Sequence, residues 1–436
     1  MARVAIVGAG AMGLAAAYHA LGLGHRVTVF EGDRVAGGMA AHLDFDGLSI
    51  ERFYHFVCKA DRPTFELLAE LGIADRMVWR DTSMGYYVDG RHHRWGDPLA
   101  LLAFPRLGLL DKVRYGLHMF LQTRRRDWSA LEHVSARDWF LKWHGARAYD
   151  VLWRRLFDLK FFEYADDISA AWIWTRIKRV GTSRRSIFQE QLGYIDGGSQ
   201  TLVDALVEAI EARGGELRLG ARVGEITSEA GRVTGCVVDG TPHAFDAVIS
   251  TVPTPFVPAM VPGLSPEARA RYEAIRNIGV VCVLLKLARP VTSHFWLNVN
   301  DPAIEVPGIV EFSNLRPMPD PVVYVPYYMP QTHPKFARPD EAFVEEAFGY
   351  LRRLNPALQP EDLKASRVGR LRHAQPVCPP GFLAQIPRVQ TGIAGLQVAD
   401  TCFYYPEDRG ISESVRYGRL LARGVDDPAV WDAEGR

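Results

Sequence analysis

The chain has 436 residues, and its 51 basic and 51 acidic residues give a formal net charge of zero. This balance argues against nucleic acid as a partner held by bulk electrostatics, and the length exceeds one ordinary core, so we expect two domains. Hydrophobic residues make up 48% of the sequence, but no run of 18 apolar residues occurs, which predicts no membrane-spanning helix.

The first thirty residues combine two short apolar runs with a glycine-rich turn. The β-branched run at 4–7 predicts a buried parallel strand, the Ala/Leu-rich stretch 12–23 predicts a helix, and 27–30 predicts a second strand that ends at Glu31. Such a strand–helix–strand unit is the frame in which dinucleotide-binding motifs occur.

Gly8, Gly10 and Gly13 have the spacing G-x-G-x-x-G between the first strand and the helix. Gly8 allows the tight turn, Gly10 allows close approach of a pyrophosphate, and Gly13 allows the helix to pack on the strand. The helix would begin at Ala11 and Met12, where free N–H groups attract an anion. Glu31 would accept hydrogen bonds from a ribose, whereas a glycine-rich packing turn, the alternative, leaves that acid unexplained.

A second glycine pair follows the acid, in the order Gly32, Arg34, Gly37, Gly38, Met39. The pattern Arg-x-x-Gly-Gly after a ribose-binding acid resembles the flavoprotein family of monoamine oxidase, protoporphyrinogen oxidase and phytoene desaturase. In that family the segment lines the pyrophosphate and flavin of FAD, so the resemblance implies FAD contacts from these five residues. The residues themselves agree, because paired glycines permit close backbone approach or a positive φ.

A hairpin expected over 43–50 leads into Arg52, Tyr54 and His55, our candidates for chemistry on the substrate side. In the resembled superfamily this segment lies close to the flavin ring, and UDP-galactopyranose mutase has an aromatic, histidine-bearing loop at a comparable place. The alternative for His55 is a hydrogen-bonded histidine in a packed loop.

The middle of the sequence predicts a helical region and an aromatic-rich region. Residues 98–121 are apolar and end near Arg124, Arg125 and Arg126, so they form either helices over the active site or a peripheral membrane attachment. Aromatic side chains crowd 151–179, where they are core or the wall of an apolar pocket. Lys160 and Arg176 would bind a substrate anion there or lie at the surface.

The chain then resembles the family's return to its FAD domain. Gly197 and Gly198 form a turn before an expected helix at 201–213, and the resemblance implies that the backbone of Val223 meets the adenine. The strand expected at 247–253 carries Thr251 beside the cofactor. From 280 to 328, apolar and alternating runs predict antiparallel strands under the substrate, with Tyr324, Tyr327 and Tyr328 as candidates to face the cavity.

The last forty residues carry a further motif of the same resemblance. Asp400 would bind the ribityl or pyrophosphate region, and the N–H groups of Gly410, Ile411 and Ser412 would face the flavin. A helix N-terminus there stabilises the charge of reduced flavin. Cys402 does not occupy the position of the cysteine that attaches flavin in covalent monoamine oxidases, so we predict non-covalent FAD.

We therefore predict an α/β protein with a Rossmann-like FAD-binding domain and a second, mixed α+β substrate domain, as in the amine oxidase and glutathione reductase-like FAD folds. The FAD domain would comprise 1–75, 195–255 and 370–425, the substrate or lid domain 76–194 and 256–369, and the tail 426–436.

The predicted function is an FAD-dependent oxidoreductase that moves a hydride from an apolar or lipid-linked small molecule to flavin N5. A non-redox isomerase resembling UDP-galactopyranose mutase is the alternative, with Arg52, Arg176, Arg372 and Arg409 available for a diphosphate. A flavin-bearing scaffold without turnover is a third reading. Five scattered cysteines and a strand that starts almost at Met1 suggest a cytoplasmic protein without a metal cluster. Peripheral membrane contact and the oligomeric state stay open.

Overall fold

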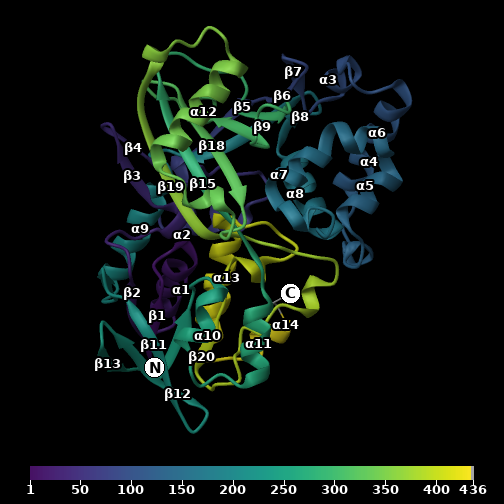
Figure 1. The fold of residues 1–436 in the computed structure, drawn as a ribbon. Coiled ribbons are helices and arrows are strands. Elements are labelled where there is room, and N and C mark those ends of the chain that lie inside the picture. Colours follow the sequence, from purple (N-terminus) through teal and green to yellow (C-terminus); the bar gives the residue numbers. More distant parts are fainter. Residues whose placement is uncertain (434–436) are drawn as a thin grey trace.

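The computed structural model describes residues 1–433. A nucleotide-binding region with both termini lies at the bottom of Figure 1, a large sheet lies above it, and a group of helices lies to the right. The last three residues of the predicted tail, 434–436, lie outside the described residues. Within the part that is described, no helix is long and apolar enough to cross a membrane.

The nucleotide-binding region is built on a five-stranded sheet in which every pairing is parallel. Its strands, in spatial order, are β10 (Glu216–Leu219), β2 (Arg26–Glu31), β1 (Arg3–Val7), β14 (Ala247–Ser250) and β20 (Leu396–Val398). Segments from the beginning, the middle and the end of the sequence therefore form one sheet, as the predicted discontinuous domain requires.

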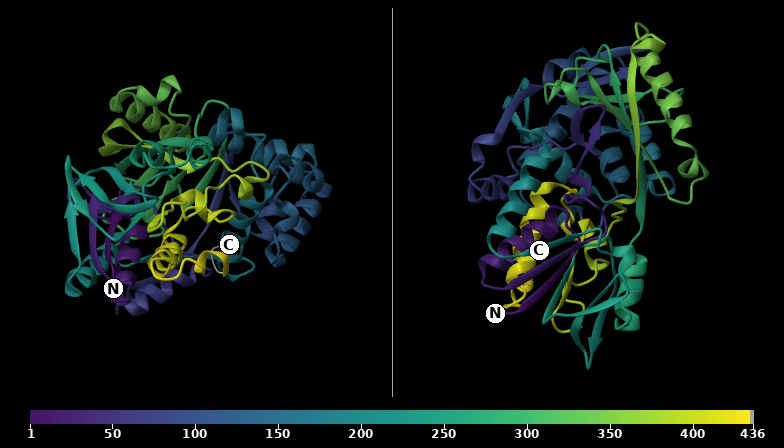
Figure 2. Two further views of the ribbon diagram at one scale, coloured as in Figure 1. Left: turned by 90° about the horizontal axis from the view of Figure 1, so that it is seen from below. Right: turned by 90° about the vertical axis from the view of Figure 1, so that its left-hand side faces the viewer.

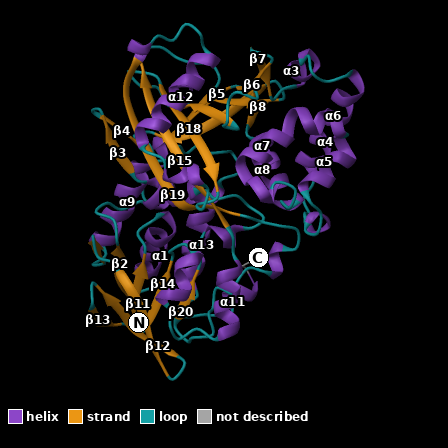
Figure 3. Ribbon diagram, viewed as in Figure 1, coloured by secondary structure: helices purple, strands orange, loops and turns teal. Residues whose placement is uncertain are grey.

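Helices cover one face of this sheet and a β-meander covers the other (Figures 1 and 3). Val4 and Ile6 of β1 lie in the same core cluster as Leu14 of the first helix, whereas Ala5 and Val7 pack with the meander, as the two-residue period of a strand dictates. The helices are α1 (Ala11–Gly22), α2 (Arg62–Glu70), α9 (Ser199–Ala212) and α13 (Ile411–Arg423). On the other side lie β11 (Val223–Glu229), β12 (Arg232–Val238), β13 (Thr241–Ala244), α10 (Val257–Met260) and α11 (Pro266–Ala274).

The upper region contains a seven-stranded mixed sheet. Its order is β19 (Leu363–Pro376), β15 (Asn277–Leu287), β18 (Val322–Met329), β17 (Gly308–Glu311), β16 (Trp296–Asn300), β6 (Met84–Val88) and β7 (Arg91–Trp95). Helix α12 (Asp340–Leu354) packs on one face of this sheet. Smaller sheets join the regions: β3 (His42–Phe45) with β4 (Leu48–Glu51), and β5 (Met77–Thr82) with β9 (Gln189–Ile195) and β8 (Arg184–Ser186).

The helical group is formed by one continuous part of the chain, seen at one side of the molecule in Figures 1 and 2. It contains α3 (Pro98–Ala103), α4 (Leu109–Arg124), α5 (Ala136–His144), α6 (Ala146–Tyr149), a π-helical turn (Asp150–Arg154), α7 (Arg155–Phe161) and α8 (Ala170–Thr182). Ser135 and Ser169 cap α5 and α8 by accepting N–H bonds from their first turns. A short helix, α14 (Val430–Ala433), ends the described chain.

The α/β architecture predicted from the sequence is confirmed. The exact domain limits stay a prediction, and β19 runs across the expected limit at residue 370, because it pairs with β15 as far as Pro376. The regions also share packing, since one core cluster contains Leu14 of α1, Trp172 of α8 and Tyr324 of β18.

Candidate active site

One cavity of about 1690 Å³ extends from the turn between β1 and α1 to the helices α3 and α4. It receives side chains and backbone from the parallel sheet, the mixed sheet and the helical group, so it lies where the three regions meet. Nearly all of the site residues expected from the sequence line it.

The glycines of the first turn have distinct roles. Gly8 has a φ of +104°, and its N–H donates to the carbonyl of Phe30 at 2.8 Å, which ties the turn to β2. A Cβ at Gly13 would lie 1.9 Å from the Gly8 oxygen, so this position permits the close contact of helix and turn. A Cβ at Gly10 would meet no atom of residues 1–433 within 4 Å beyond its chain neighbours, because Gly10 faces the cavity. Ala11 and Met12 line the cavity beside it, whereas Gly13 does not.

The Glu31 carboxylate fixes the adjacent loops at the end of β2. One oxygen accepts from the Ala9 N–H at 2.7 Å and the other from the Asp33 N–H at 2.8 Å. Each carboxylate oxygen has a second acceptor position, and Glu31 lines the cavity. The arrangement fits a carboxylate that accepts ribose hydroxyls.

Gly37 and Gly38 allow the loop after β2 to pack closely against the turn between β1 and α1. Their φ angles are +111° and +58°, and the Gly37 N–H donates to the Ala9 carbonyl at 2.7 Å. A Cβ at Gly38 would lie 3.2 Å from the Gly10 Cα, so a side chain there would push this loop away. Gly32 and Met39 also line the cavity. Arg34 is exposed and does not line it, although its N–H donates to Asp33, so its predicted contact is not supported by its position.

Three more of the expected cofactor contacts, Val223, Thr251 and Asp400, come shortly after β10, β14 and β20 of the parallel sheet. Val223 and Thr251 line the cavity, and the Thr251 hydroxyl donates to the Val7 carbonyl at 3.1 Å. The Asp400 carboxylate accepts from the N–H groups of Thr254 at 2.5 Å and Cys402 at 2.8 Å. Thr254 is a contact that sequence reasoning missed, and no local pattern links it to Asp400.

The N-terminus of α13 also borders the cavity. Gly410, Ile411 and Ser412 all line it, and a Cβ at Gly410 would meet open space among the described residues. The buried Ser412 hydroxyl has no hydrogen-bond partner within residues 1–433. An unpaired buried hydroxyl, an open glycine and free helix N–H groups fit a bound cofactor that supplies acceptor atoms. The residues present therefore fit FAD.

All three candidate catalytic residues line the cavity, but Arg52 lies toward the loop that follows Glu31. Arg52 pairs with Asp33 at 2.5 Å, and the Tyr54 ring makes edge contacts with Trp296 and Tyr324. His55 lines the cavity, and its Nδ1 atom is buried without a partner in the described structure. Burial lowers the pKa of His55 below its ordinary value, although the Glu51 charge opposes this shift, so the imidazole is neutral at pH 7.

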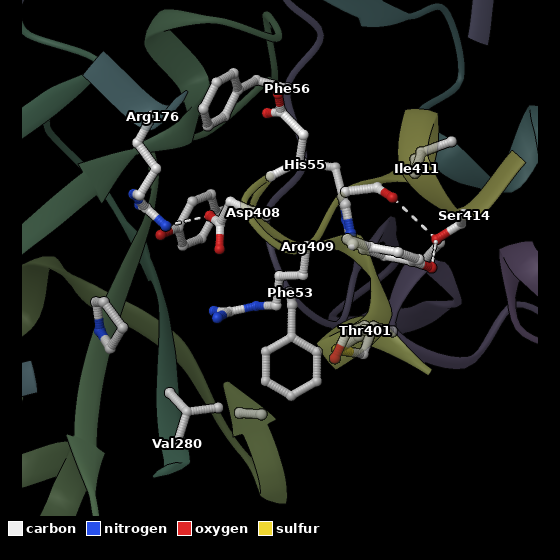
Figure 4. A pocket seen from close by; sticks show the side chains of 18 of the residues that line it. Phe53, His55, Phe56, Arg176, Val280, Thr401, Asp408, Arg409, Ile411 and Ser414 are labelled. Carbon is white, nitrogen blue, oxygen red and sulfur yellow. Dashed lines mark hydrogen bonds and ion pairs between the residues drawn. The ribbon is translucent and has the colours of Figure 1, made fainter. Parts of the chain in front are cut away.

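Four charged side chains form a cluster in the same cavity, which we call the charged cluster: Lys160, Arg176, Asp408 and Arg409. Figure 4 shows Arg176 directed toward Asp408, with Arg409 nearby and Ile411 and Ser414 on the opposite side. Arg176 and Asp408 form an ion pair, and Arg409 donates to Gln375. Burial alone would raise the pKa of Asp408, but Arg176, Arg409, Lys160 and Arg179 lower it to about 2.

Three other residues that were expected at the cavity do not line it: Arg372, Tyr324 and Tyr327. Arg372 is exposed on β19 and does not line the cavity. Tyr328 lines it, but Tyr324 lies beneath and donates to the Glu51 carbonyl at 2.6 Å. Tyr327 packs against Phe343 of α12 on the opposite face of the sheet. Two-residue alternation along β18 would have separated Tyr327 from the other two tyrosines.

Comparison with known proteins places the chain among flavoproteins. A model of the family described as flavin containing amine oxidoreductase matches residues 13–401. A 15-cis-phytoene desaturase of Capsicum annuum is 27% identical over 283 residues, which cover 60% of this chain and 48% of the relative. The 15-cis-phytoene desaturase of Synechococcus elongatus is 25% identical over 374 residues, with 79% and 74% covered. The chain thus spans about half the length of the first of these relatives.

Solved structures share the fold at low identity. A putrescine oxidase variant has a TM-score of 0.76 at 18% identity, with 98% of this chain and 99% of that chain covered. Reduced UDP-galactopyranose mutase has a TM-score of 0.71 at 16% identity, with 98% and 96% covered. The chain belongs to the family of flavin-containing amine oxidoreductases, and its cofactor is FAD.

Proposed function

We propose that this protein is an FAD-dependent oxidoreductase that dehydrogenates a largely apolar small molecule. The observation that carries the proposal is the continuity of the cavity, which joins the glycine cradle and the α13 N-terminus to a chamber lined by Trp153, Trp172 and Trp296. When bound, FAD accepts a hydride from a substrate C–H bond at its N5 atom. The aromatic walls bind the substrate and exclude water from the reacting atoms.

The protein's own groups support this reaction by position and charge. The α13 N-terminus directs N–H groups and its positive dipole end to the place where negative charge would develop. The neutral His55 imidazole lines the cavity and is available to take the proton that leaves with the hydride. Cys402 is buried, contacts Thr254 and does not line the cavity, which supports a cofactor held without a covalent bond.

An absorbance spectrum of the purified protein tests the proposal first. Flavin bands, with FAD released into the supernatant after acid precipitation, are expected. Anaerobic addition of 15-cis-phytoene or protoporphyrinogen in detergent should then bleach the bands if either resembles the substrate. A flavin that no apolar substrate and no chemical reductant can reduce would instead support a scaffold without turnover.

A flavin-dependent isomerase is the second candidate, because the charged cluster places Arg176 and Arg409 in the cavity. Reduced UDP-galactopyranose mutase, which shares the fold, supports it further. Chemically reduced protein should then convert UDP-galactopyranose to a ring-contracted isomer while the flavin stays reduced. Turnover that requires an electron acceptor would exclude this candidate.

We also propose that the protein acts in the cytoplasm and attaches to the surface of a membrane through α3 and α4. Large apolar side chains are exposed there: Leu99, Leu102, Leu109, Leu110, Val113, Leu117 and Phe120. Arg124, Arg125 and Arg126 follow directly and suit anionic headgroups. The five cysteines are all free and buried, which is consistent with a reducing compartment.

Sedimentation with vesicles of phosphatidylcholine and phosphatidylglycerol tests this attachment. The protein should sediment with anionic vesicles, and the double change Leu109→Glu and Leu110→Glu should release it while the flavin spectrum stays intact. The control changes Leu23→Glu and Leu219→Glu replace apolar residues that are also exposed but lie at the end of α1 and in β10 of the parallel-sheet region, and neither residue lines the cavity. Equal sedimentation of both double variants would refute the attachment through α3 and α4.

A further inference from the structure

Lys160 is a buried cation without an acidic partner. Its side chain is 6% exposed and lines the cavity from the last turn of α7. Its Nζ lies 5.1 Å from the centre of the Trp172 ring and 5.0 Å from that of Tyr328. Within residues 1–433 no carboxylate lies within 4 Å of this ammonium group. An unpaired charge in such a place is unfavourable unless something else compensates it.

The neighbouring charges do not supply that compensation. Asp408 already pairs with Arg176, and its second oxygen is buried without a partner among the described residues. Arg409 donates to the neutral Gln375 amide and has no acid within 4 Å in the described chain. The charged cluster therefore holds three basic side chains and one carboxylate. Even when Lys160 is neutral, the cations Arg176 and Arg409 exceed the Asp408 carboxylate by one positive charge at an otherwise aromatic end of the cavity.

We propose that the substrate carries an acid group, a carboxylate or a phosphate, that binds between Lys160 and Arg409. This proposal rests on the oxidoreductase function and narrows its substrate from apolar to amphipathic. The apolar part of the molecule lies along the aromatic walls, and the acid group pairs with the excess cations. In a site that excludes water, a charge-assisted hydrogen bond to each of two cations anchors the acid group. This anchor determines which bond of a long hydrocarbon chain lies against the flavin.

The titration of Lys160 is consistent with this arrangement. Burial, and then the charge of Arg176, hold the pKa of Lys160 well below its ordinary value, while Asp408 and Cys378 oppose this shift and Arg409 adds to it. An arriving anion favours the protonated amine. Binding of the acid group is therefore coupled to proton uptake when the free lysine is partly neutral.

The experiment measures binding by calorimetry on the holoprotein with three probes of one chain length: farnesol, farnesoic acid and farnesyl phosphate. At least one acid should bind the wild type tenfold more tightly than the alcohol, which corresponds to about 1.4 kcal/mol. The acid that binds more tightly identifies the group as a carboxylate or a phosphate. Equal affinity for all three probes would overturn the proposal, and this comparison needs no variant.

Variants then locate the subsite. Lys160→Met should weaken binding of the acid at least tenfold and leave the affinity for the alcohol within twofold of the wild type. Lys160→Arg should retain the preference for the acid. Lys142→Met, at an exposed lysine of α5, is the matched control and should bind like the wild type. A folded, yellow Lys160→Met protein with an unchanged preference for the acid would also overturn the proposal.

The test of the acid subsite is independent of the test of the proposed function, because calorimetry measures binding without turnover. Preference for the acid in a protein whose flavin no substrate reduces would retain the subsite and refute the oxidoreductase. Reduction of the flavin by a neutral hydrocarbon, without any preference for the acid in binding, would retain the oxidoreductase and refute the acid subsite. Repeating the titration in two buffers with different ionisation enthalpies measures the proton uptake directly.

Discussion

Gly10 and Gly13 of the first turn have different surroundings, in keeping with the different roles that the motif gives them. Gly10 opens onto the cavity, whereas Gly13 is in contact with the Gly8 carbonyl. Gly10→Val should abolish FAD binding and leave the melting temperature of the apoprotein unchanged, because the new side chain occupies only cofactor space. Gly13→Val should lower that temperature by several degrees, since overpacking costs about 1–3 kcal/mol.

Thermal scans of the cofactor-free proteins, with FAD binding followed by absorbance, check both outcomes. Comparison without FAD matters, because a bound ligand raises the melting temperature by mass action. Full FAD content in the Gly10→Val protein would contradict the assignment of this turn as the pyrophosphate cradle.

The lowered pKa of His55 predicts how turnover and stability depend on pH. Since its pKa in the folded protein lies below the ordinary 6.5, turnover should be flat from pH 7 to 8 and fall as the pH drops through that lowered pKa. The same sign holds for stability: the unfolded state takes up the proton first, so the contribution of a neutral His55 is lost as the pH falls below about 6.5.

Replacing His55 tests whether its imidazole takes part in turnover. His55→Gln should keep the flavin, lower kcat about a hundredfold or more if the imidazole takes the proton, and remove the acid limb of the kcat profile. A variant with full turnover and the same acid limb would show that His55 only shapes the pocket.

Short-range patterns predicted the cradle because its chemistry is local. Gly8, Gly10 and Glu31 lie within one strand–helix–strand unit and Gly37 follows it directly, so short-range spacing and the family resemblance suffice to predict them. The charged cluster could not be assembled in this way, because Lys160 comes from α7 and Asp408 from the loop before α13. Their proximity depends on how the helical group packs on the parallel sheet, which no spacing records.

At the scale of elements, the packing of α13 on α1 positions one end of the cofactor site. A Cβ at Gly418 would lie 2.7 Å from the Ala15 Cβ and 2.7 Å from the Met12 carbonyl oxygen. Gly418→Leu should therefore displace α13, with Gly410 and Ser412 at its N-terminus, and weaken FAD binding at least tenfold. Gly349→Leu in α12, where a Cβ meets no described atom within 4 Å, is the control.

Equilibrium titration of the apoproteins with FAD measures this difference. The control should bind like the wild type and be slightly more stable, since glycine is unfavourable inside a helix by about 1 kcal/mol. Unchanged affinity in Gly418→Leu would mean that α13 does not need its close contact with α1 to reach the cofactor.

The helices that follow the glycine motifs were predicted within a residue or two of their bounds, as for α1 and α9. The region from Asp150 to Thr182 was predicted only as aromatic-rich, and the structure divides it into a π-helical turn and two helices. α7 ends where Phe162 adopts a φ of +52°. Non-glycine residues rarely take such an angle, so the break depends on tertiary packing and has no local signal.

At the scale of the whole molecule, the shared core predicts one cooperative unit despite two kinds of sheet. Leu14, Trp172 and Tyr324 belong to a single buried cluster. Urea unfolding of the holoprotein, followed by flavin circular dichroism and by tryptophan fluorescence, should therefore give coincident transitions. A tryptophan transition that precedes flavin loss would show that the helical group unfolds by itself.

The discontinuous sheet has a consequence for biosynthesis. Gly10 and Ser412 face one cavity, yet almost the whole described chain is made between them. Domains tend to fold in the order of their synthesis, but here the cofactor has no complete site until α13 has left the ribosome. FAD therefore cannot guide the early steps of folding, and it can bind in full only after almost the whole described chain has been made.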